Sequence, residues 1–255
     1  MDSTPGRRAA PALAGLLLAA FMIMVSGCVE GRPGTPGGEY QPISGVVRGH
    51  VMTSYGTPVS RAEVFADNRM SYNTNLTTLT DESGYYEIQV PDIYTGSWRI
   101  GGYKTVQLGD VSVRMPLTDV TGGTFTASKG AVRNLEWRLS GSTIEGGHYG
   151  SDVWVYPMSE SDEVPTSQVE LTLTPVGALV DGSEGETLVR TPSIRRIGDV
   201  PLGTYLASAR YLDGKDAIDL LIRVRDTGSP APTVTTTFAL SPFDTPQIEF
   251  EVTWP

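Results

Sequence analysis

The sequence is poor in the residues from which most metal and redox sites are built. It contains one cysteine and two histidines in 255 residues. A single cysteine cannot form an internal disulfide, and so few cysteine and histidine ligands exclude zinc fingers and most histidine-based metal catalysis. Neither His50 nor His148 is followed by the His-x-x-Glu spacing of a zinc peptidase. No Gly-x-Ser-x-Gly nucleophile elbow is present either. We therefore expect no catalytic residue, no metal and no cofactor.

Positive charge is also scarce. The chain has 19 Lys+Arg against 29 Asp+Glu, a formal net charge of −10. Binding to phosphate backbones needs clustered lysine and arginine, so we expect no nucleic-acid partner. Two acidic stretches, 160–163 and 181–186, carry oxygen ligands that calcium could use, but they match no EF-hand spacing. We interpret them as solvated loops, with calcium binding left open.

Helical periodicity is missing from the chain beyond residue 43. Short alternations of apolar and polar residues lie between turn signals instead, and the sequence holds 29 glycines and 18 prolines. In one such run Tyr86, Ile88 and Val90 alternate with polar neighbours, as a strand with one buried face should. The run 81–84 (DESG) before it reads as a turn, since aspartate caps the backbone and glycine adopts positive φ. The sequence predicts an all-β fold.

The first 28 residues have the pattern of a targeting segment. Arg7 and Arg8 precede an apolar stretch, 12–25. At about fourteen residues this stretch has the size of a signal-peptide core and is short for a bilayer span, which needs about 20. The run 25–28 (VSGC) resembles the bacterial lipobox, an aliphatic residue, two small residues and an obligatory cysteine.

In lipobox proteins the cysteine thiol carries a diacylglycerol and the leader is removed just before it. The resemblance implies that residues 1–27 are a lipoprotein signal peptide and that Cys28 is the lipidated residue. It also implies an extracytoplasmic protein, bound to the bacterial cell membrane or outer membrane through the lipid on Cys28. Residues 28–43 are rich in glycine and proline, which predicts a flexible tether. An irregular strand of the fold is the alternative interpretation of that segment.

Three runs carry a second resemblance, to the carboxypeptidase regulatory-like domain: 47–51 (VRGHV), 56–64 (GTPVSRAEV) and 78–86 (TLTDESGYY). The resemblance implies a prealbumin-like β-sandwich over residues 44–140. The family name reflects an accessory domain attached to a peptidase, so it implies no activity. One departure is a longer loop, 91–97, that ends at Trp98 where the family usually has tyrosine.

Residues 141–255 repeat this architecture in a divergent form. The run 201–205 (PLGTY) supplies a Pro-Leu-Gly-x-Tyr signature that the first module lacks, and 248–254 (IEFEVTW) resembles the earlier closing strand 135–139 (LEWRL). We therefore expect two tandem prealbumin-like or Ig-like β-sandwiches after the signal peptide and tether. One large sandwich is the alternative.

Aromatic residues are the remaining candidates for binding. Trp137 and Trp254 lie in the closing strands, where alternation favours the core, which leaves Trp98 and Trp154 as possible ligand-facing residues. For Trp98, burial in the core is the alternative. These observations predict a non-catalytic envelope lipoprotein, an accessory or adhesion-type module for an envelope protein or polysaccharide. A structural spacer without a ligand and an enzyme without a recognisable motif are the alternatives.

Overall fold

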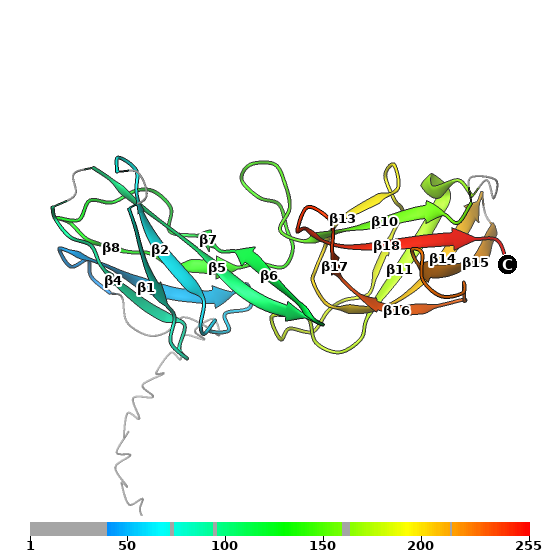
Figure 1. Cartoon of the computed structure of the whole chain (residues 1–255), viewed down its shortest axis with the longest axis horizontal. Coiled ribbons are helices and arrows are strands. Elements are labelled where there is room, and N and C mark those ends of the chain that lie inside the picture. The colour runs from blue at the N-terminus through cyan, green and yellow to red at the C-terminus, as the bar shows by residue number, and fades with distance from the viewer. Residues whose placement is uncertain (1–39, 72–73, 94–95, 160–163, 215) are drawn as a thin grey trace, which may run out of the picture. The chain divides into compact units, whose positions relative to one another are not determined.

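The computed structural model describes residues 40–71, 74–93, 96–159, 164–214 and 216–255 (Figure 1). The predicted lipidation site Cys28, the signal peptide and most of the tether lie outside these residues. Strands dominate the described chain, and its one helical segment is a 3₁₀ turn, Thr166–Gln168. The prediction of an all-β fold is confirmed. Nowhere in the described part of the chain is there a helix with the length and hydrophobicity needed to cross a membrane.

The first half forms two facing sheets. One has the strand order β4-β1-β9-β7, with β8 also paired to β1, and the other has the order β3-β2-β5-β6. The strands are β1 (Val46–Thr53), β2 (Glu63–Asn68), β3 (Asn75–Leu79), β4 (Tyr85–Gln89), β5 (Trp98–Leu108), β6 (Val111–Pro116), β7 (Thr118–Asp119), β8 (Ala131–Val132) and β9 (Leu135–Trp137).

Alternation along these strands fills the core between the sheets. Tyr86 and Ile88 are 1% and 5% exposed, as their spacing predicts. Gly49 of β1 has a specific role, because a Cβ there would lie 1.7 Å from the carbonyl oxygen of Arg133. That carbonyl accepts a hydrogen bond of 2.7 Å from the Tyr86 hydroxyl. The glycine therefore lets the segment before β9 approach β1 closely.

The second half forms one hydrogen-bonded sheet. Its strand order is β12-β11-β14-β15-β18-β10-β13, with β16 on β14 and β17 on β18. The strands are β10 (Ser151–Pro157), β11 (Val169–Pro175), β12 (Leu188–Arg190), β13 (Arg196–Val200), β14 (Thr204–Asp213), β15 (Asp216–Val224), β16 (Val234–Thr237), β17 (Ala239–Leu240) and β18 (Pro246–Thr253).

β15 connects the two parts of this sheet. Its first residues pair with β14, up to Leu220 opposite Ala209, and its last residues pair with β18, from Leu221 opposite Thr253. The two parts enclose a core that includes Phe250, which is 0% exposed. The second sandwich thus differs from the first in that one strand belongs to both of its layers.

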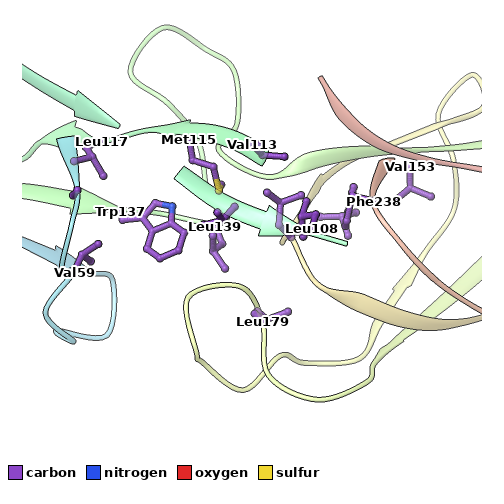
Figure 2. Close-up of a cluster of buried hydrophobic side chains, with 14 of the residues drawn as sticks. Val59, Leu108, Val113, Met115, Leu117, Trp137, Leu139, Val153, Leu179 and Phe238 are labelled. Atoms are coloured by element: carbon purple, nitrogen blue, oxygen red, sulfur yellow. The ribbon is translucent and has the colours of Figure 1, made fainter. Parts of the chain in front are cut away.

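Strand pairing and packing give different divisions of the chain. Every named ladder among the described residues joins strands within 46–137 or within 151–253, whereas the described residues from 40 to 255 belong to one compact unit. Figure 2 shows one group of buried side chains drawn from both segments, including Leu108, Met115 and Phe238.

The last residues of the predicted tether contact the fold. Tyr40 stacks on His50 of β1 with ring centroids 5.6 Å apart. Arg48 donates a 2.9 Å hydrogen bond to the carbonyl oxygen of Gln41, and Ile43 pairs with Val46. Residues 40–43, placed in the tether by composition, are therefore held against β1.

Candidate functional site

Trp98 does not face a ligand. Its side chain is 0% exposed, and its backbone N–H donates a 2.8 Å hydrogen bond to the carbonyl oxygen of Phe125. As the first residue of β5, Trp98 shares its inward face with Ile100, so the ring enters the core of the first sandwich. The ligand-facing interpretation of Trp98 is wrong, and the core alternative is correct.

Trp154, the other candidate, lies on the outer face of β10. Its neighbours Val153 and Val155 are fully buried, whereas Trp154 and Tyr156 are partly exposed. The two outward rings are nearly parallel, with 15° between their planes and 6.5 Å between their centroids. Tyr156 was missed by sequence reasoning, although its spacing of two residues from Trp154 on an alternating strand could have identified it.

The strands on both sides of β10 place polar groups beside Trp154. β10 lies between β13 and β18 (Figure 1), and Trp154 is in register with Arg196 on β13 and Glu249 on β18. The Glu249 carboxylate accepts hydrogen bonds from Gln247 and, at 2.8 Å, from Arg225 in the turn that follows β15. Trp154 is therefore flanked by a guanidinium, a carboxylate and an amide.

Guanidinium groups cover the ring of Tyr156. Arg225 lies 4.3 Å and Arg195 lies 5.7 Å from the ring centroid, within cation–π range. The hydrogen bond to Glu249 is the main reason that the pKa of Arg225 is raised further above its ordinary value. One or both faces of the Tyr156 ring are therefore already in contact with side chains of the chain itself.

A network beside β10 fixes Arg196. The Nε of Arg196 lies 2.9 Å from the Asp152 carboxylate, and its Nη2 lies 2.8 Å from Nε2 of His148. The Nδ1 of His148 lies 2.7 Å from the carbonyl oxygen of Gly150, which only accepts hydrogen bonds. A neutral His148 with its hydrogen on Nδ1 satisfies both contacts, donating to Gly150 and accepting from Arg196.

Asp199 holds the loop that precedes β10. One carboxylate oxygen accepts hydrogen bonds from the backbone N–H groups of Gly141, at 2.9 Å, and Gly150, at 3.0 Å. The residue itself has a φ of 60°, a left-handed conformation that aspartate tolerates better than most residues. A strained residue kept in place by its own hydrogen bonds therefore anchors the start of the strand that carries Trp154.

We call the following residues the aromatic face: Trp154, Tyr156, Arg195, Arg196, Arg225, Gln247 and Glu249. It combines an accessible indole with hydrogen-bonding groups held by ion pairs. Such a set of groups can bind a ligand by stacking on the indole and by hydrogen bonding at its edge. Among the described residues, no group of three or more His, Cys, Asp or Glu side chains could hold a metal ion.

The acidic loop 181–186 forms a turn. The Asp181 carboxylate accepts hydrogen bonds from the backbone N–H, at 3.0 Å, and the hydroxyl of Ser183. One of its oxygens is therefore committed to shaping the loop itself. The other acidic stretch, 160–163, lies outside the described residues.

The sequence matches no protein-family model and no curated protein. Three solved structures overlap with the chain weakly. The first is the Bacillus anthracis TIE protein, with 10% identity, a TM-score of 0.32, and coverage of 82% of this chain and 43% of that protein. The second is the pilus adhesin SpaC from Lactobacillus rhamnosus GG, with 8% identity, a TM-score of 0.25, and coverage of 81% of this chain and 28% of the adhesin. The third is the Streptococcal ancillary pilin, with 13% identity, a TM-score of 0.26, and coverage of 80% of this chain and 62% of the pilin.

The chain spans less than two thirds of each of these three structures. Overlap at such TM-scores carries no functional information. The specific resemblance to the carboxypeptidase regulatory-like domain stays a prediction, since no family model matches.

Proposed function

We propose that this protein is a non-catalytic, adhesion-type module of the bacterial envelope that binds a polysaccharide through the aromatic face. The observation that carries the proposal is the pair Trp154 and Tyr156 on one outer face of β10, with Glu249 and Arg196 in register beside Trp154. A second aromatic on the same face separates this surface from a scattered exposed tryptophan, which needs no explanation.

The chemistry of the face suits a sugar polymer. The apolar side of a pyranose ring stacks on an indole, while its hydroxyls need donors and acceptors around the edge of that contact. Arg196 supplies donors, Glu249 supplies acceptors, and Gln247 supplies an amide. The ion pairs hold these groups in place before a ligand arrives, which lowers the entropic cost of binding.

An envelope protein is the second candidate ligand. Tryptophan, tyrosine and arginine are the residues most enriched at the energetic centres of protein interfaces. The aromatic face contains all three, with Arg225 and Arg195 on Tyr156. This composition is the specific observation in favour of a protein partner.

Anchoring at the membrane is the other part of the proposal. Lipidation of Cys28 would hold the folded region outside the cytoplasm, on the cell membrane or the outer membrane, since two acyl chains give stable attachment. Metabolic labelling with a fatty-acid analogue tests this assignment. Label should enter the full chain and be lost in Cys28→Ala, and label retained in that variant would refute it.

A glycan array with the chain from residue 29 onward tests the ligand class. We expect signal on a subset of polysaccharides from the wild-type chain and its loss in Trp154→Ala. Tyr55→Ala is the matched control, because Tyr55 is a 68% exposed aromatic outside the aromatic face. Capture of an envelope protein through Trp154, with no glycan signal, would support the second candidate. If neither a glycan nor an envelope protein bound, the alternative function, a structural spacer without a ligand, would be favoured.

A further inference from the structure

A second surface with binding chemistry lies on the first sandwich, on the outer side of β2 and β5. An open cavity of about 760 Å³ is found there, a volume within the range of small-ligand sites. Its lining includes Phe65, Asp67, Arg69, Met70, Asn75 and Arg99. The aromatic face belongs to β10, β13, β18, the turn before β13 and the turn after β15, so the two surfaces share no residue.

Phe65 forms the apolar wall of this cavity. It is in register with Gly101 on β5, and a Cβ at Gly101 would lie 2.5 Å from the tip of the phenyl ring. The ring therefore lies across the glycine, close to the sheet. On its other side is Tyr103, with 5.8 Å between the centroids and 30° between the planes. Tyr103 is itself covered by Arg114 at 4.1 Å, so Phe65 is the aromatic group left to the cavity.

The side chains that line the cavity carry a net positive charge, whereas the chain as a whole is negatively charged. Two guanidinium groups, Arg69 and Arg99, line it together with one carboxylate, Asp67, in a protein of net charge −10. Arg99 donates a 2.8 Å hydrogen bond from Nε to Asp67, and its side chain is 63% exposed. A guanidinium presented in this way binds a carboxylate through paired hydrogen bonds.

Hydrogen bonds to the buried Asn68 side chain fix the turn that carries Arg69. The Asn68 side chain is 3% exposed, and its Oδ1 accepts hydrogen bonds of 2.9 Å from the backbone N–H groups of Met70 and Ser71. The backbone N–H of Arg69 donates to the carbonyl oxygen of Ser97 at 3.0 Å. The backbone at Arg69 is therefore set beside Phe65 and Arg99 in advance of binding.

We propose that this cavity binds an acidic sugar, a hexuronic-acid type of ring stacked on Phe65 with its carboxylate on Arg99 and Arg69. Asp67 and Asn75 would receive its hydroxyls. A neutral sugar would use the ring contact but leave both guanidinium groups without an anionic partner. All residues of this site belong to the first sandwich, so it can be tested independently of the aromatic face.

Calorimetric titration of the chain from residue 29 onward tests the site. The probes are a trimer of galacturonic acid and the neutral trimer of galactose. We expect binding of the acidic trimer at least about ten-fold tighter than of the neutral one, with an affinity that falls as salt is raised. Arg99→Gln and Phe65→Ala should each weaken binding of the acidic trimer about ten-fold or more.

Arg114→Gln is the matched control, because Arg114 lies on the same outer face and pairs with Glu63 at 3.0 Å much as Arg99 pairs with Asp67. It should bind the acidic trimer as the wild-type chain does. Arg99 is 63% exposed in its side chain, so Arg99→Gln should fold even if Phe65→Ala does not.

Three results would overturn the proposal: no binding, equal binding of both trimers, or binding that is lost in Trp154→Ala and kept in Arg99→Gln. The last of these would place the acidic sugar on the aromatic face instead. If the wild-type chain bound no glycan through Trp154 but still bound the acidic trimer through Arg99 and Phe65, only the proposed function of the second sandwich would be refuted.

Discussion

Trp154 and Tyr156 lie on the same outer face of β10, with 15° between their ring planes and 6.5 Å between their centroids. Arg225, from a turn more than sixty residues away in the sequence, lies 4.3 Å from the centroid of the Tyr156 ring and is hydrogen-bonded to Glu249. The two rings thus become part of a larger surface because β18 and the turn after β15 place charged groups beside them. From this arrangement we expect the face to bind a ligand that stacks on Trp154.

The two tryptophans that seemed alike in sequence should behave differently when truncated. Trp98→Ala removes a fully buried ring and should lower the free energy of unfolding by about 3–5 kcal/mol. Trp154→Ala removes a partly exposed ring and should cost about 1 kcal/mol or less. Urea unfolding followed by circular dichroism measures both. Equal losses would contradict the assignment of Trp98 to the core and Trp154 to the surface.

Gly84 should be intolerant of any side chain. It has a φ of 75° in the turn before β4, and a Cβ there would lie 2.4 Å from the carbonyl oxygen of Val51. Gly84→Ala combines backbone strain with this clash, so we expect the free energy of unfolding to fall by about 2 kcal/mol or more. Gly109→Ala is the control, because Gly109 has a φ of 58° and open space around it. Its loss should be about 1 kcal/mol, and an equal loss in both variants would show that the clash is absent.

Stability should fall as the solution becomes mildly acidic, because of His50. Burial beneath Tyr40 and Tyr85 lowers the pKa of His50 from its ordinary value of 6.5, and nearby Asp81 opposes the shift. Well above pH 6.5 the His50 ring is neutral in both the folded and the unfolded chain, so it adds no pH dependence to the free energy of unfolding. Below that pH the unfolded chain binds the proton first, so the free energy of unfolding declines with falling pH until the folded state is protonated too.

Urea unfolding between about pH 5 and 8 reveals this titration, because histidine titrates in that range. His50→Gln should flatten the slope. Stability that rises in the wild-type chain as the pH falls through this range would contradict the account of His50.

Asp199 should couple the loop before β10 to the aromatic face. Asp199→Ala removes the acceptor for the N–H groups of Gly141 and Gly150 while keeping an unfavourable positive φ. We expect a loss of about 2 kcal/mol in the free energy of unfolding. Asp199→Asn keeps one acceptor oxygen and tolerates the same φ, so it should lose clearly less. Hydrogen exchange at Gly141 and Gly150 provides the local measurement, and unchanged protection in Asp199→Ala would disprove the anchoring role.

Local patterns in the sequence were enough to predict the strands and turns. The alternation at Tyr86 and Ile88 identified the buried face of β4, and the 81–84 turn forms with Asp81 accepting the N–H groups of Ser83 and Tyr85. These features depend only on neighbours in the chain. The direction of Trp98 was not predictable in the same way, because a loop precedes it and fixes no phase for the strand that follows.

The candidate sites depend on pairings that no local pattern contains. Trp154 was identified from its residue type, but its partner Glu249 comes from β18, which lies parallel to β10 after a separation of about ninety residues in sequence. The position of Phe65 across Gly101 likewise needs the register of β2 with β5. Without an observed register, the charges beside each ring could not be assigned.

The affinity of Trp154→Ala for the glycan that the wild-type chain binds is the measurement that decides whether Trp154 stacks on the ligand. Titration calorimetry on the chain from residue 29 onward should show at least about ten-fold weaker binding, since loss of an aromatic stack costs about 1–3 kcal/mol. Its midpoint of thermal unfolding should stay near that of the wild-type chain and of Tyr55→Ala. Wild-type affinity in a folded Trp154→Ala variant would contradict the claim that this face binds the ligand.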